Sequence, residues 1–495
     1  MAPLDGIGPR PTDAPALENG KLENASRRFL LKGLVASGAL VVGASLLPRR
    51  AFADYATGAN LMPHGTVNDP HVFVSIDPSG EVTIIAHRSE MGPGPRTSLP
   101  MIVADEMEAD WSRVKIQQAP GDEARYGNQD TDGSRSIRHF LQPMRQCGAA
   151  MRQMLEQAAA TRWGVDRSTV QAQNHEVVHT ATGRKFGYGE LAAAASALPT
   201  PPVAQLKLKA AKDYRYMGKG QVQIYDLRDI TMGRAQYGID TRLPGMKYAV
   251  IARPPVVGGK LVSFDATDAL KVPGVEKVIE VQGWPWPSKF QPLGGVAVIA
   301  RNTGSAIKGR AALKITWDDG ANKTYDSVEY RKLLEKGSRN PGQIGRDQGN
   351  IDAAMQNAAK VVTAEYYLPH LAHASMEPPA AVADVKADSA EVWAPVQSAG
   401  GTHEDTAKTL GLPMDKVRVN VTLLGGAFGR KSKCDFALEA ALVSKAIGAP
   451  VKVTWTREDD IQHDFYHTVS VERIEAALDK NNKVVGWRHR SSAPS

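Results

Sequence analysis

Apolar and polar residues follow different periods in different parts of the chain, and these periods predict its elements. Between residues 71 and 92 they alternate on both sides of Pro78-Ser79-Gly80, which predicts a β-hairpin. Residues 97–111 and 144–165 instead carry apolar side chains at helical spacing. We therefore expect a mixed domain of helices and strands in this part of the chain.

The middle of the chain follows a break rich in Pro and Ala at residues 192–208. Residues 237–281 read as strand, turn, strand, a short helix at 265–271, and another strand. A charged, Gly-rich connection then spans residues 318–350, with one predicted helix at 327–337. The middle segment is expected to be an α/β unit with a β-rich core.

The last part of the chain carries several short apolar runs of β type. The predicted strands are 361–368, 380–385, 390–395, 417–424 and 451–456. The patterns together predict a multi-domain α+β protein. Its expected segments are 1–53, 54–217, 218–322 and 323–495.

A glycine-rich turn joins the predicted strand that ends at Leu424 to a helix that begins near Asp435. Glycines at 425, 426 and 429 allow positive φ angles and expose backbone N–H groups, so a phosphate or another oxyanion is the expected ligand. The spacing is neither that of a Rossmann fingerprint nor that of a P-loop. A tight strand-to-helix turn without a ligand is the alternative.

Composition indicates a globular protein and argues against nucleic acid as a partner. The chain has 495 residues, 42% of them hydrophobic, and a net charge of +7. Residues 1–53 hold seven Lys or Arg and four Asp or Glu, which leaves about +4 for the rest, with no dense basic run. The two cysteines, Cys147 and Cys434, cannot form an iron–sulfur site with four cysteine ligands.

The N-terminus resembles a twin-arginine export signal. Arg27 and Arg28 precede a moderately apolar stretch at 33–47 and the small-residue cleavage site Ala51-Phe52-Ala53. The apolar stretch is shorter than the ~20 residues that a membrane-spanning helix needs. We expect a periplasmic protein that begins near Asp54 and carries a cofactor inserted before export. An arginine pair on a solvated helix is the alternative.

Three motifs in a fixed order make the chain similar to a known family. His-Ala-x-Met-Glu-Pro at 373–378, Trp-Ala-Pro-x-Gln at 393–397 and Gly-Gly-x-Phe-Gly-Arg at 425–430 resemble the molybdopterin-binding large subunit of the xanthine oxidase family. The blocks at 89–106 and 131–138 resemble the branch of isoquinoline oxidoreductases and membrane-associated aldehyde dehydrogenases. The middle segment resembles the family's α/β hammerhead domain.

The resemblance implies site residues. Gln397 would hydrogen-bond an oxo ligand of molybdenum, with Phe428 beside the reacting centre, and the pterin would hold the metal without a protein ligand. In this branch the cofactor is commonly molybdopterin cytosine dinucleotide. The implied cofactor-binding residues are Gly92, Gly94, Arg96, Thr97, Ser134, Ser136, Gly425, Gly426, Ala427, Phe428, Gly429 and Arg430.

Several of these positions have a purely structural alternative. Gln397 could be a surface amide, and Met376 and Phe428 could belong to a core. His370 and His373 are expected to cap or pack rather than to bind a metal.

The chain also departs from the family pattern. Pro93 stands where the family usually has Gln, and Pro95 is added beside it, which removes one side-chain donor and one backbone N–H. The family's general-base glutamate, near the end of longer members, has no plausible counterpart here. Glu90 and Glu377 belong to other motifs, and Glu377 is expected to be a buried structural carboxylate.

The resemblance implies oxidation of an aldehyde, or hydroxylation of an N-heteroaromatic with oxygen from water. Electrons would pass to a [2Fe-2S] small subunit and to haem in a cytochrome c subunit, and any membrane contact would be through a partner. Because of Pro93 and the missing base, a degenerate or truncated binding and assembly module is the alternative. A nucleotide-binding enzyme of another class is disfavoured by the absence of its fingerprints.

Overall fold

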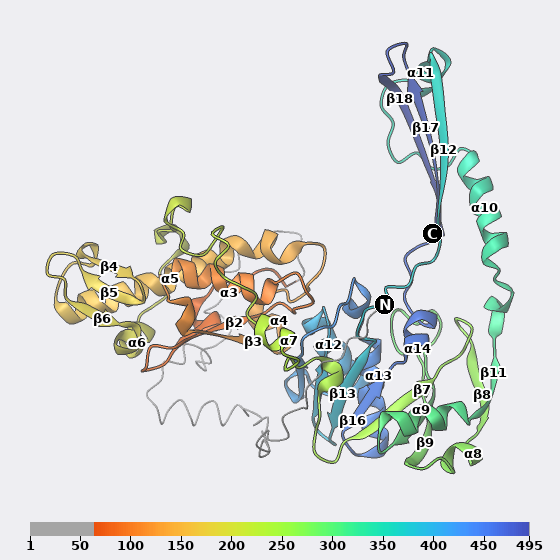
Figure 1. Ribbon diagram of the computed structural model, residues 1–495, viewed down its shortest axis with the longest axis horizontal. Coiled ribbons are helices and arrows are strands. Elements are labelled where there is room, and N and C mark those ends of the chain that lie inside the picture. The colour runs from red at the N-terminus through yellow and green to blue at the C-terminus, as the bar shows by residue number, and fades with distance from the viewer. Residues whose placement is uncertain (1–63, 495) are drawn as a thin grey trace, which may run out of the picture.

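The computed structural model describes residues 64–494, and Figure 1 shows them as two bodies and a projecting arm. The predicted export signal at 1–53 lies outside the described residues. None of the helices in the described part is long and apolar enough to cross a membrane. Helices and sheets are mixed throughout, which confirms the α+β prediction.

The N-terminal body is built on the predicted hairpin. Strands β1 (Val74–Ile76) and β2 (Val82–Ala86) pair antiparallel, and β3 (Val114–Gln118) pairs parallel with β2. Helices α3 (Pro95–Glu106) and α5 (Arg135–Trp163) pack together beside this sheet. Alternate residues of β2 are buried, as the period of two predicted, and they join the apolar faces of both helices in one core.

The second body contains a seven-stranded sheet in which several inner strands are buried almost continuously, whereas the edge strands are partly exposed. Its central strand β16 (Val451–Thr454) pairs parallel with β7 (Lys247–Ala252), so the sheet takes strands from both sides of the predicted boundary at residue 322. Helices α12 (Ala399–Leu410) and α13 (Asp435–Ile447) pack against it. The strands in spatial order are β15 (Val417–Val421), β14 (Ala390–Ala394), β13 (Ala380–Val385), β16 (Val451–Thr454), β7 (Lys247–Ala252), β10 (Gly295–Ala300) and β9 (Val275–Val281).

The middle segment has the predicted order of elements. Strand β7 is followed by β8 (Lys260–Asp265), the short helix α8 (Thr267–Leu270) and β9. Helix α9 (Thr303–Ala311) then leads to β11 (Lys314–Asp318), which pairs antiparallel with β8. The expected strand, turn, strand, helix and strand are therefore confirmed.

A three-stranded antiparallel sheet projects from the second body as an arm (Figure 1). Strand β17 (Ser470–Leu478) lies between β12 (Lys360–Leu368) and β18 (Val484–Ser492). Helices α10 (Ser327–Arg339) and α11 (Ile351–Gln356) contact β17 and β18. The predicted helix at 327–337 and the predicted strand at 361–368 are both confirmed.

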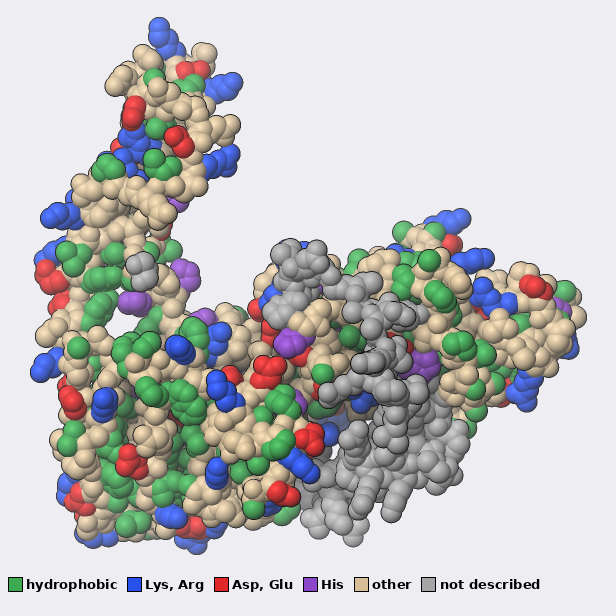
Figure 2. Space-filling view, turned by 180° about the vertical axis from the view of Figure 1, so that it is seen from behind, with side chains coloured by type: hydrophobic (Ala, Val, Ile, Leu, Met, Phe, Trp, Pro, Cys, Tyr) green, Lys and Arg blue, Asp and Glu red, His purple; other side chains and the backbone are tan. Residues whose placement is uncertain are grey.

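The remaining elements are short. They are α2 (Pro70–Phe73), α4 (Glu123–Tyr126), β4 (Val170–Gln173), β5 (Glu176–His179), β6 (Lys185–Gly187), α6 (Tyr188–Ser196), α7 (Leu227–Thr231) and α14 (Arg457–Gln462). Among them, β4, β5 and β6 form a three-stranded sheet beside α5. On the face in Figure 2, basic and acidic side chains are interspersed outside the grey atoms. No continuous basic surface of the kind that binds nucleic acid is seen on that face.

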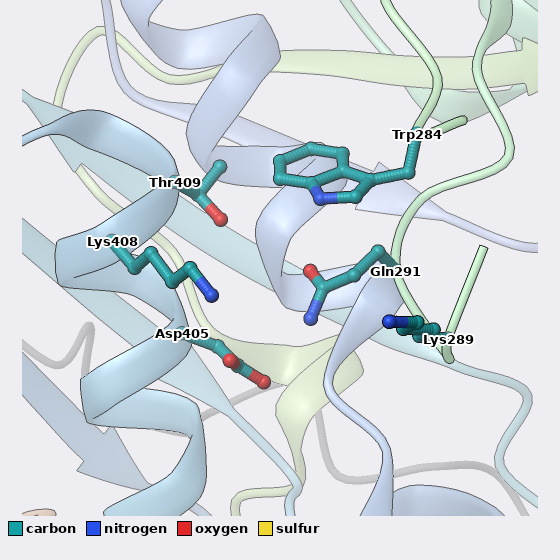
Figure 3. A pocket seen from close by; sticks show the side chains of 6 residues that line it. All are labelled: Trp284, Lys289, Gln291, Asp405, Lys408 and Thr409. Atoms are coloured by element: carbon teal, nitrogen blue, oxygen red, sulfur yellow. The ribbon is translucent and has the colours of Figure 1, made fainter.

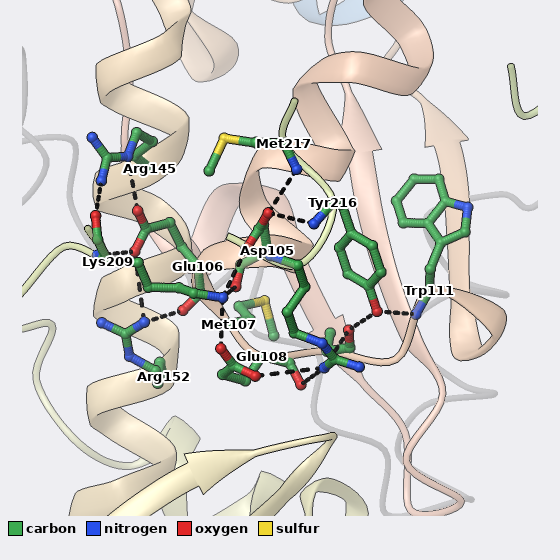
Figure 4. Close-up of polar contacts among 12 residues, drawn as sticks. Asp105, Glu106, Met107, Glu108, Trp111, Arg145, Arg152, Lys209, Tyr216 and Met217 are labelled. Carbon is green, nitrogen blue, oxygen red and sulfur yellow. Dashed lines mark hydrogen bonds and ion pairs between the residues drawn. The ribbon is translucent and has the colours of Figure 1, made fainter. Parts of the chain in front are cut away.

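The Asp105 carboxylate fastens the segment after the Pro- and Ala-rich break to the N-terminal body (Figure 4). It is fully buried and accepts backbone N–H groups from Arg215 at 3.1 Å, Tyr216 at 2.9 Å and Met217 at 2.8 Å. Lys209 Nζ lies 2.7 Å from Asp105 Oδ1. Burial alone would raise the pKa of Asp105, but the Lys209 and backbone bonds outweigh it and lower the pKa below 3.8.

Replacing this carboxylate should release the segment that it holds. In Asp105→Asn, we expect the amides of residues 215–217 to exchange with solvent about 10- to 100-fold faster, because charged hydrogen bonds are worth roughly 1.5–3 kcal/mol each. The lowered pKa means that wild-type stability from this group is present above about pH 4 and is lost as the pH falls through the folded-state pKa. Asp105→Asn should not show this loss.

Hydrogen exchange at neutral and acidic pH measures both effects. Asp347→Asn is the matched control, because Asp347 is exposed. Equal exchange rates at residues 215–217 in the two variants would contradict the role given to Asp105.

Candidate functional site

Four segments that are far apart in the sequence meet at the ends of β2, β14 and β15. Ser89 donates its hydroxyl to the carbonyl of Val396 at 2.7 Å, and its own carbonyl accepts the Thr131 hydroxyl at 3.1 Å. The Leu424 N–H donates to the carbonyl of Glu90 at 3.0 Å. The structure therefore brings together segments of the blocks that the sequence singled out at 89–106, 131–138, 393–397 and 425–430.

The Gln397 side chain lies at the centre of this meeting point. Its Nε2 donates to the Thr131 carbonyl at 2.8 Å, and its Oε1 accepts the Gly429 N–H at 3.0 Å. Only 1% of the residue is exposed, so the alternative of a surface amide is wrong. An amide can still donate its second hydrogen, and the role of Gln397 toward an oxo ligand stays a prediction.

The glycine-rich turn presents backbone donors. Gly426 and Gly429 have φ angles of 86° and 112°, and Phe428, which is not a glycine, has 56°. The N–H groups of Gly426, Ala427 and Phe428 have no hydrogen-bond partner within residues 64–494. β15 ends at Val421 rather than at Leu424 as predicted, because the chain already turns toward Glu90, whereas α13 begins at Asp435 as predicted.

Two apolar side chains stand in solvent beside this turn. Phe428 is 68% exposed and Met376 is 85% exposed, so the alternative that they belong to a core is wrong. A strained backbone at an exposed aromatic residue has no packing reason and is typical of functional sites.

Gly425 is packed closely against Glu377, and its contact with the cofactor stays a prediction. A Cβ at this position would lie 2.5 Å from the Cβ of Glu377. The Glu377 carboxylate accepts the Gly425 N–H at 2.9 Å, the Ile239 N–H at 3.0 Å and Lys431 Nζ at 2.8 Å. The prediction of a buried structural carboxylate at Glu377 is therefore confirmed.

Arg430, one of the predicted binding residues, has its side chain engaged inside the protein, and its contact with the cofactor stays a prediction. Its Nη1 and Nη2 atoms each lie 2.8 Å from an oxygen of Asp435, and its Nε lies 3.1 Å from Asp464. Burial alone would lower the pKa of Arg430, but the two carboxylates outweigh it and raise the pKa. His373 also pairs with Asp464, with 2.9 Å between Nδ1 and the carboxylate, as expected of a packing histidine.

The glycine-containing loop at residues 90–96 folds around the carboxylate of its own Glu90. Glu90 accepts the N–H groups of Gly92 at 2.8 Å, Gly94 at 3.0 Å and Arg96 at 3.2 Å. These donors, expected to face a pyrophosphate, point inward instead. That part of the prediction is wrong because the loop carries its own anion. Contact between the cofactor and the outer side of the loop stays a prediction.

The two prolines of this loop fit the inward arrangement. Pro93 and Pro95 alternate with the three donors, so the loop lacks N–H groups only at positions that do not face Glu90. Pro95 is the first residue of α3, where a missing N–H costs nothing. On the outer side, a Cβ at Gly92 would meet no atom within 4 Å, and one at Gly94 only Ser98 Oγ at 3.8 Å. The outer side is open to a bulky ligand.

Of the other predicted cofactor-binding residues, the side chains of two already have partners among the described residues and those of the other two do not. The Arg96 guanidinium pairs with Asp226, and Thr97 Oγ1 accepts the Tyr225 N–H at 2.9 Å. Ser134 is exposed, has a φ of 55° and precedes α5 without a side-chain capping bond. Ser136 lies in the first turn of α5. The serines are therefore free to contact a ligand, whereas the Arg96 side chain is held by protein.

Two small cavities lie to one side of the glycine turn. One of about 120 Å³ is lined by Trp284, Lys289, Gln291, Asp405, Lys408 and Thr409 (Figure 3). The other, of about 200 Å³, reaches Ser398 and Ser432. Both are below the roughly 300 Å³ of typical ligand pockets, and neither is lined by Gln397 or by residues 426–428. The candidate site is therefore the open surface around the turn.

The donor set suits an anionic cofactor. Three unpaired N–H groups at 426–428, the open outer sides of Gly92 and Gly94, and a buried guanidinium at Arg88 without a hydrogen bond all favour phosphate or oxo groups. Within the described range no group of three or more His, Cys, Asp or Glu residues could hold a metal ion.

Comparisons with known proteins agree with this donor set. Two sequence families, both described as molybdopterin cofactor-binding domain, match residues 336–493 and 50–229. The chain is 32% identical over 489 residues to a membrane-bound aldehyde dehydrogenase (pyrroloquinoline-quinone) from Gluconacetobacter polyoxogenes, a match covering 96% of this chain and 61% of that protein. It is 32% identical over 474 residues to the beta subunit of isoquinoline 1-oxidoreductase from Brevundimonas diminuta, covering 86% of this chain and 59% of that protein.

The chain belongs to the xanthine oxidase family of molybdopterin-binding large subunits. The resemblance seen in the three motifs is thereby confirmed. A further relative, a subunit of nicotinate dehydrogenase from Pseudomonas putida, is 27% identical over 433 residues, covering 86% of this chain and 35% of that protein. The chain spans 61% and 59% of the length of the two relatives named first.

Sequence reasoning did not assign roles to four residues of this site: Arg88, Glu90, Lys431 and Asp464. Lys431 and Asp464 act through partners distant in sequence, which no local pattern reveals. For Glu90 a signal existed, because prolines at every second position leave N–H groups that can converge on one acceptor.

The Glu377–Lys431 pair yields a stability prediction for this family member. Burial lowers the pKa of Lys431 although Glu377 opposes the shift. Glu377→Ala leaves a buried ammonium without a carboxylate, so we expect about 3–5 kcal/mol less free energy of unfolding. Glu377→Ala combined with Lys431→Met should recover more than about 1 kcal/mol of that loss, because the two residues are coupled.

Urea denaturation of the full chain measures these differences. Glu280→Ala, at an exposed position of β9, is the control. The single variant Lys431→Met is measured as well. A double variant whose loss of unfolding free energy equals the sum of the losses in Glu377→Ala and Lys431→Met would exclude the coupling.

Proposed function

We propose that this chain is the cofactor-binding part of an exported molybdenum hydroxylase. Its substrate would be an aldehyde, oxidised to a carboxylic acid, or an N-heteroaromatic ring, hydroxylated with oxygen from water. The observation that carries the proposal is the arrangement of the glycine turn, in which the buried Gln397 amide accepts the Gly429 N–H and the adjacent N–H groups at 426–428 have no partner in the described residues, in a chain of this family. Both named relatives of about 32% identity carry substrate names of these two classes.

The residues of the chain would bind and orient the cofactor. The N–H groups of Gly426, Ala427 and Phe428 would donate to its oxygen atoms, and Gln397 would direct its second amide hydrogen toward the same region. Phe428 and Met376 would cover the site and exclude water from it. When bound, the molybdenum cofactor would supply the oxygen transfer and the two-electron chemistry.

The two buried glutamates of the site are not free to act as the general base. Glu90 accepts three N–H groups, and Glu377 accepts two N–H groups and the Lys431 ammonium. Hydrogen bonds to a carboxylate favour its charged form but occupy the lone pairs that would take a proton. Since the relatives are longer than this chain, the proposal does not require the base to lie among these residues.

The dinucleotide form of the cofactor is part of the proposal. The family matches indicate a molybdopterin, and the branch suggests the cytosine dinucleotide. The name of the Gluconacetobacter relative instead gives pyrroloquinoline-quinone. Molybdenum together with released CMP would support the dinucleotide, and the quinone without molybdenum would refute it.

We also propose partner subunits for electron transfer. Cys147 and Cys434 are both buried and free, so the described chain cannot ligate a [2Fe-2S] cluster with four cysteines. A [2Fe-2S] small subunit and a cytochrome c subunit would receive the electrons, and membrane contact would be through such a partner.

One observation favours a second function, that of a non-catalytic binding or assembly module. The N–H groups of Gly92 and Gly94 are taken by Glu90, so fewer donors face a cofactor than the family pattern implies. The unpaired donors at 426–428 argue for the catalytic role.

Cofactor content distinguishes the two functions. Protein purified with its maturation machinery should contain near-stoichiometric molybdenum and release CMP on acid hydrolysis. Gly426→Val should lower both by about tenfold, because Gly426 has a φ of 86° and a side chain would lie 3.5 Å from the Phe428 ring.

Gly342→Ala is the control, because a Cβ there meets nothing within 4 Å. Folded wild-type protein with neither molybdenum nor CMP would refute the catalytic role. Equal molybdenum in Gly426→Val and in the control would refute the place given to the turn.

Export by the twin-arginine route is tested separately. Arg27→Lys combined with Arg28→Lys should retain the protein in the cytoplasm, because the resemblance assigns recognition to this pair. Cell fractionation with an immunoblot measures the change, and Arg10→Lys is the control. Undiminished periplasmic protein in the double variant would refute the route.

A further inference from the structure

A cleft with two lobes lies between helix α12 and the loop of residues 282–294, which joins β9 to β10. The smaller lobe has a volume of about 120 Å³ and the larger lobe one of about 200 Å³. They are parts of one cleft, because they share three lining residues: Lys289, Gln291 and Asp405. Figure 3 shows these side chains directed toward one space, with the ring of Trp284 along its side.

The larger lobe lies beside the glycine turn. It is lined by Ser398, which follows the buried Gln397 in the chain, and by Ser432. The Ser432 hydroxyl donates to the Gly429 carbonyl at 2.6 Å. A ligand in this lobe is therefore held next to the turn whose N–H groups are proposed to bind the cofactor.

Aromatic side chains from the loop form one wall of the cleft. Trp284 lines the smaller lobe and Phe290 lines the larger one. Phe290 packs edge-on against Phe465, with ring centroids 4.9 Å apart, and still leaves 48% of its surface exposed. A cavity of about 150 Å³ is enough to hold benzene. The larger lobe therefore has room for a single aromatic ring, which would gain from packing against Phe290.

The loop holds this wall in a strained conformation. Lys289 and Phe290 are consecutive residues other than glycine with left-handed φ angles of 50° and 66°. The Trp284 N–H donates to the Pro292 carbonyl at 3.0 Å and so closes the loop around them. Backbone strain of this kind clusters at ligand-binding sites. Here it directs two neighbouring side chains into the same lobe.

Positive charge predominates among the lining residues. Lys289, Lys408 and Lys433 line the cleft, and Asp405 is the one acidic residue among them. Asp405 Oδ2 accepts the Cys434 thiol at 3.4 Å, whereas Lys289 and Lys408 form no hydrogen bond or ion pair within residues 64–494. Both of these lysines line the smaller lobe, so two free ammonium groups are available there to an anion.

Gln291 adds an unmet polar group to the cleft. Its side chain lines both lobes, and its Oε1 atom is buried without a hydrogen-bond partner among the described residues. A half-turn of the amide exchanges its two ends, so this side chain can accept from a ligand or donate to it. A purely hydrocarbon ligand would leave the buried amide unmet, whereas a polar ligand satisfies it.

We propose that this cleft binds the substrate and selects an aromatic ring that carries a carboxylate. The ring occupies the larger lobe against Phe290, beside the glycine turn. The carboxylate occupies the smaller lobe, where it meets the ammonium groups of Lys289 and Lys408. This inference rests on the proposed function and deepens it, because it narrows the aldehyde or N-heteroaromatic to an anionic one.

Benzoate and benzamide test this preference, because they have nearly the same shape and differ in charge. Their binding is measured by titration calorimetry with the full chain produced without molybdenum. Wild-type protein should bind benzoate about tenfold more tightly than benzamide, because partly exposed ion pairs contribute up to about fivefold each. Added salt should weaken benzoate binding and leave benzamide binding unchanged.

Substitution of the two free lysines tests their role. Lys289→Gln and Lys408→Gln should each weaken benzoate binding about fivefold and leave benzamide binding unchanged, because each removes one positive charge. Both lysines are exposed, so the variants should unfold at the wild-type temperature. Lys480→Gln is the matched control, because Lys480 is exposed in the turn after β17, outside the cleft.

Three results would overturn the proposal. The first is equal affinity of the wild-type protein for benzoate and benzamide, and the second is binding of neither. The third is a loss of benzoate affinity in Lys480→Gln as large as in the two cleft variants, because the preference would then come from the net charge of the protein.

Cofactor content is a separate measurement, so failure of the proposed function can be told apart from failure of this inference. A chain that contains molybdenum and CMP but binds benzoate no better than benzamide would keep the proposed function and refute the substrate class. A folded chain without molybdenum or CMP that binds benzoate through Lys289 and Lys408 would refute the catalytic role and leave the cleft as a binding site.

Discussion

The buried amide of Gln397 is the interaction on which the site depends. Its two polar atoms join Thr131 of the N-terminal body to Gly429 of the glycine turn, and its backbone N–H and carbonyl bond to Lys431 and Thr131. An apolar residue could satisfy none of the side-chain bonds, and a charged residue would bury an unpaired charge. One neutral side chain thus ties the two bodies together at this place.

Two carboxylates hold the glycine segments from the inside. Glu90 gathers the N–H groups of the first loop, and Glu377 anchors the start of the second turn at Gly425. Each acts as an internal anion that fixes the backbone before any ligand arrives. The difference between them decides the chemistry, because the Glu90 carboxylate engages N–H groups all along its loop whereas Glu377 leaves those at 426–428 unmet. The N–H groups at 426–428 are therefore the ones that remain available to an anionic ligand.

Much of the local structure could be predicted from the sequence. The hairpin around Gly80, the helix at 327–337 and the start of α13 at Asp435 follow from apolar periodicity and turn residues. The predictions failed where long-range contacts override a local pattern. The strand predicted to end at Leu424 ends at Val421, where the chain turns toward Glu90, and the side chain of Arg430, one of the predicted binding residues, is enclosed by Asp435 and Asp464. Local patterns also could not predict which strands share the seven-stranded sheet, because the paired strands β7 and β16 are about two hundred residues apart in the chain.

The sequence by itself determined the family, the order of the elements and the segments that form the site. Motif order and apolar spacing are properties of the chain, and they can be recognised without knowing which distant residues are in contact. Only the tertiary structure decided which polar groups are engaged and which are free. Gly92 and Gly426 look equivalent in the sequence, but one N–H faces Glu90 and the other has no partner in the described residues. The physical reason is that hydrogen bonding and burial depend on which segments meet, and those meetings are set by packing across the whole fold.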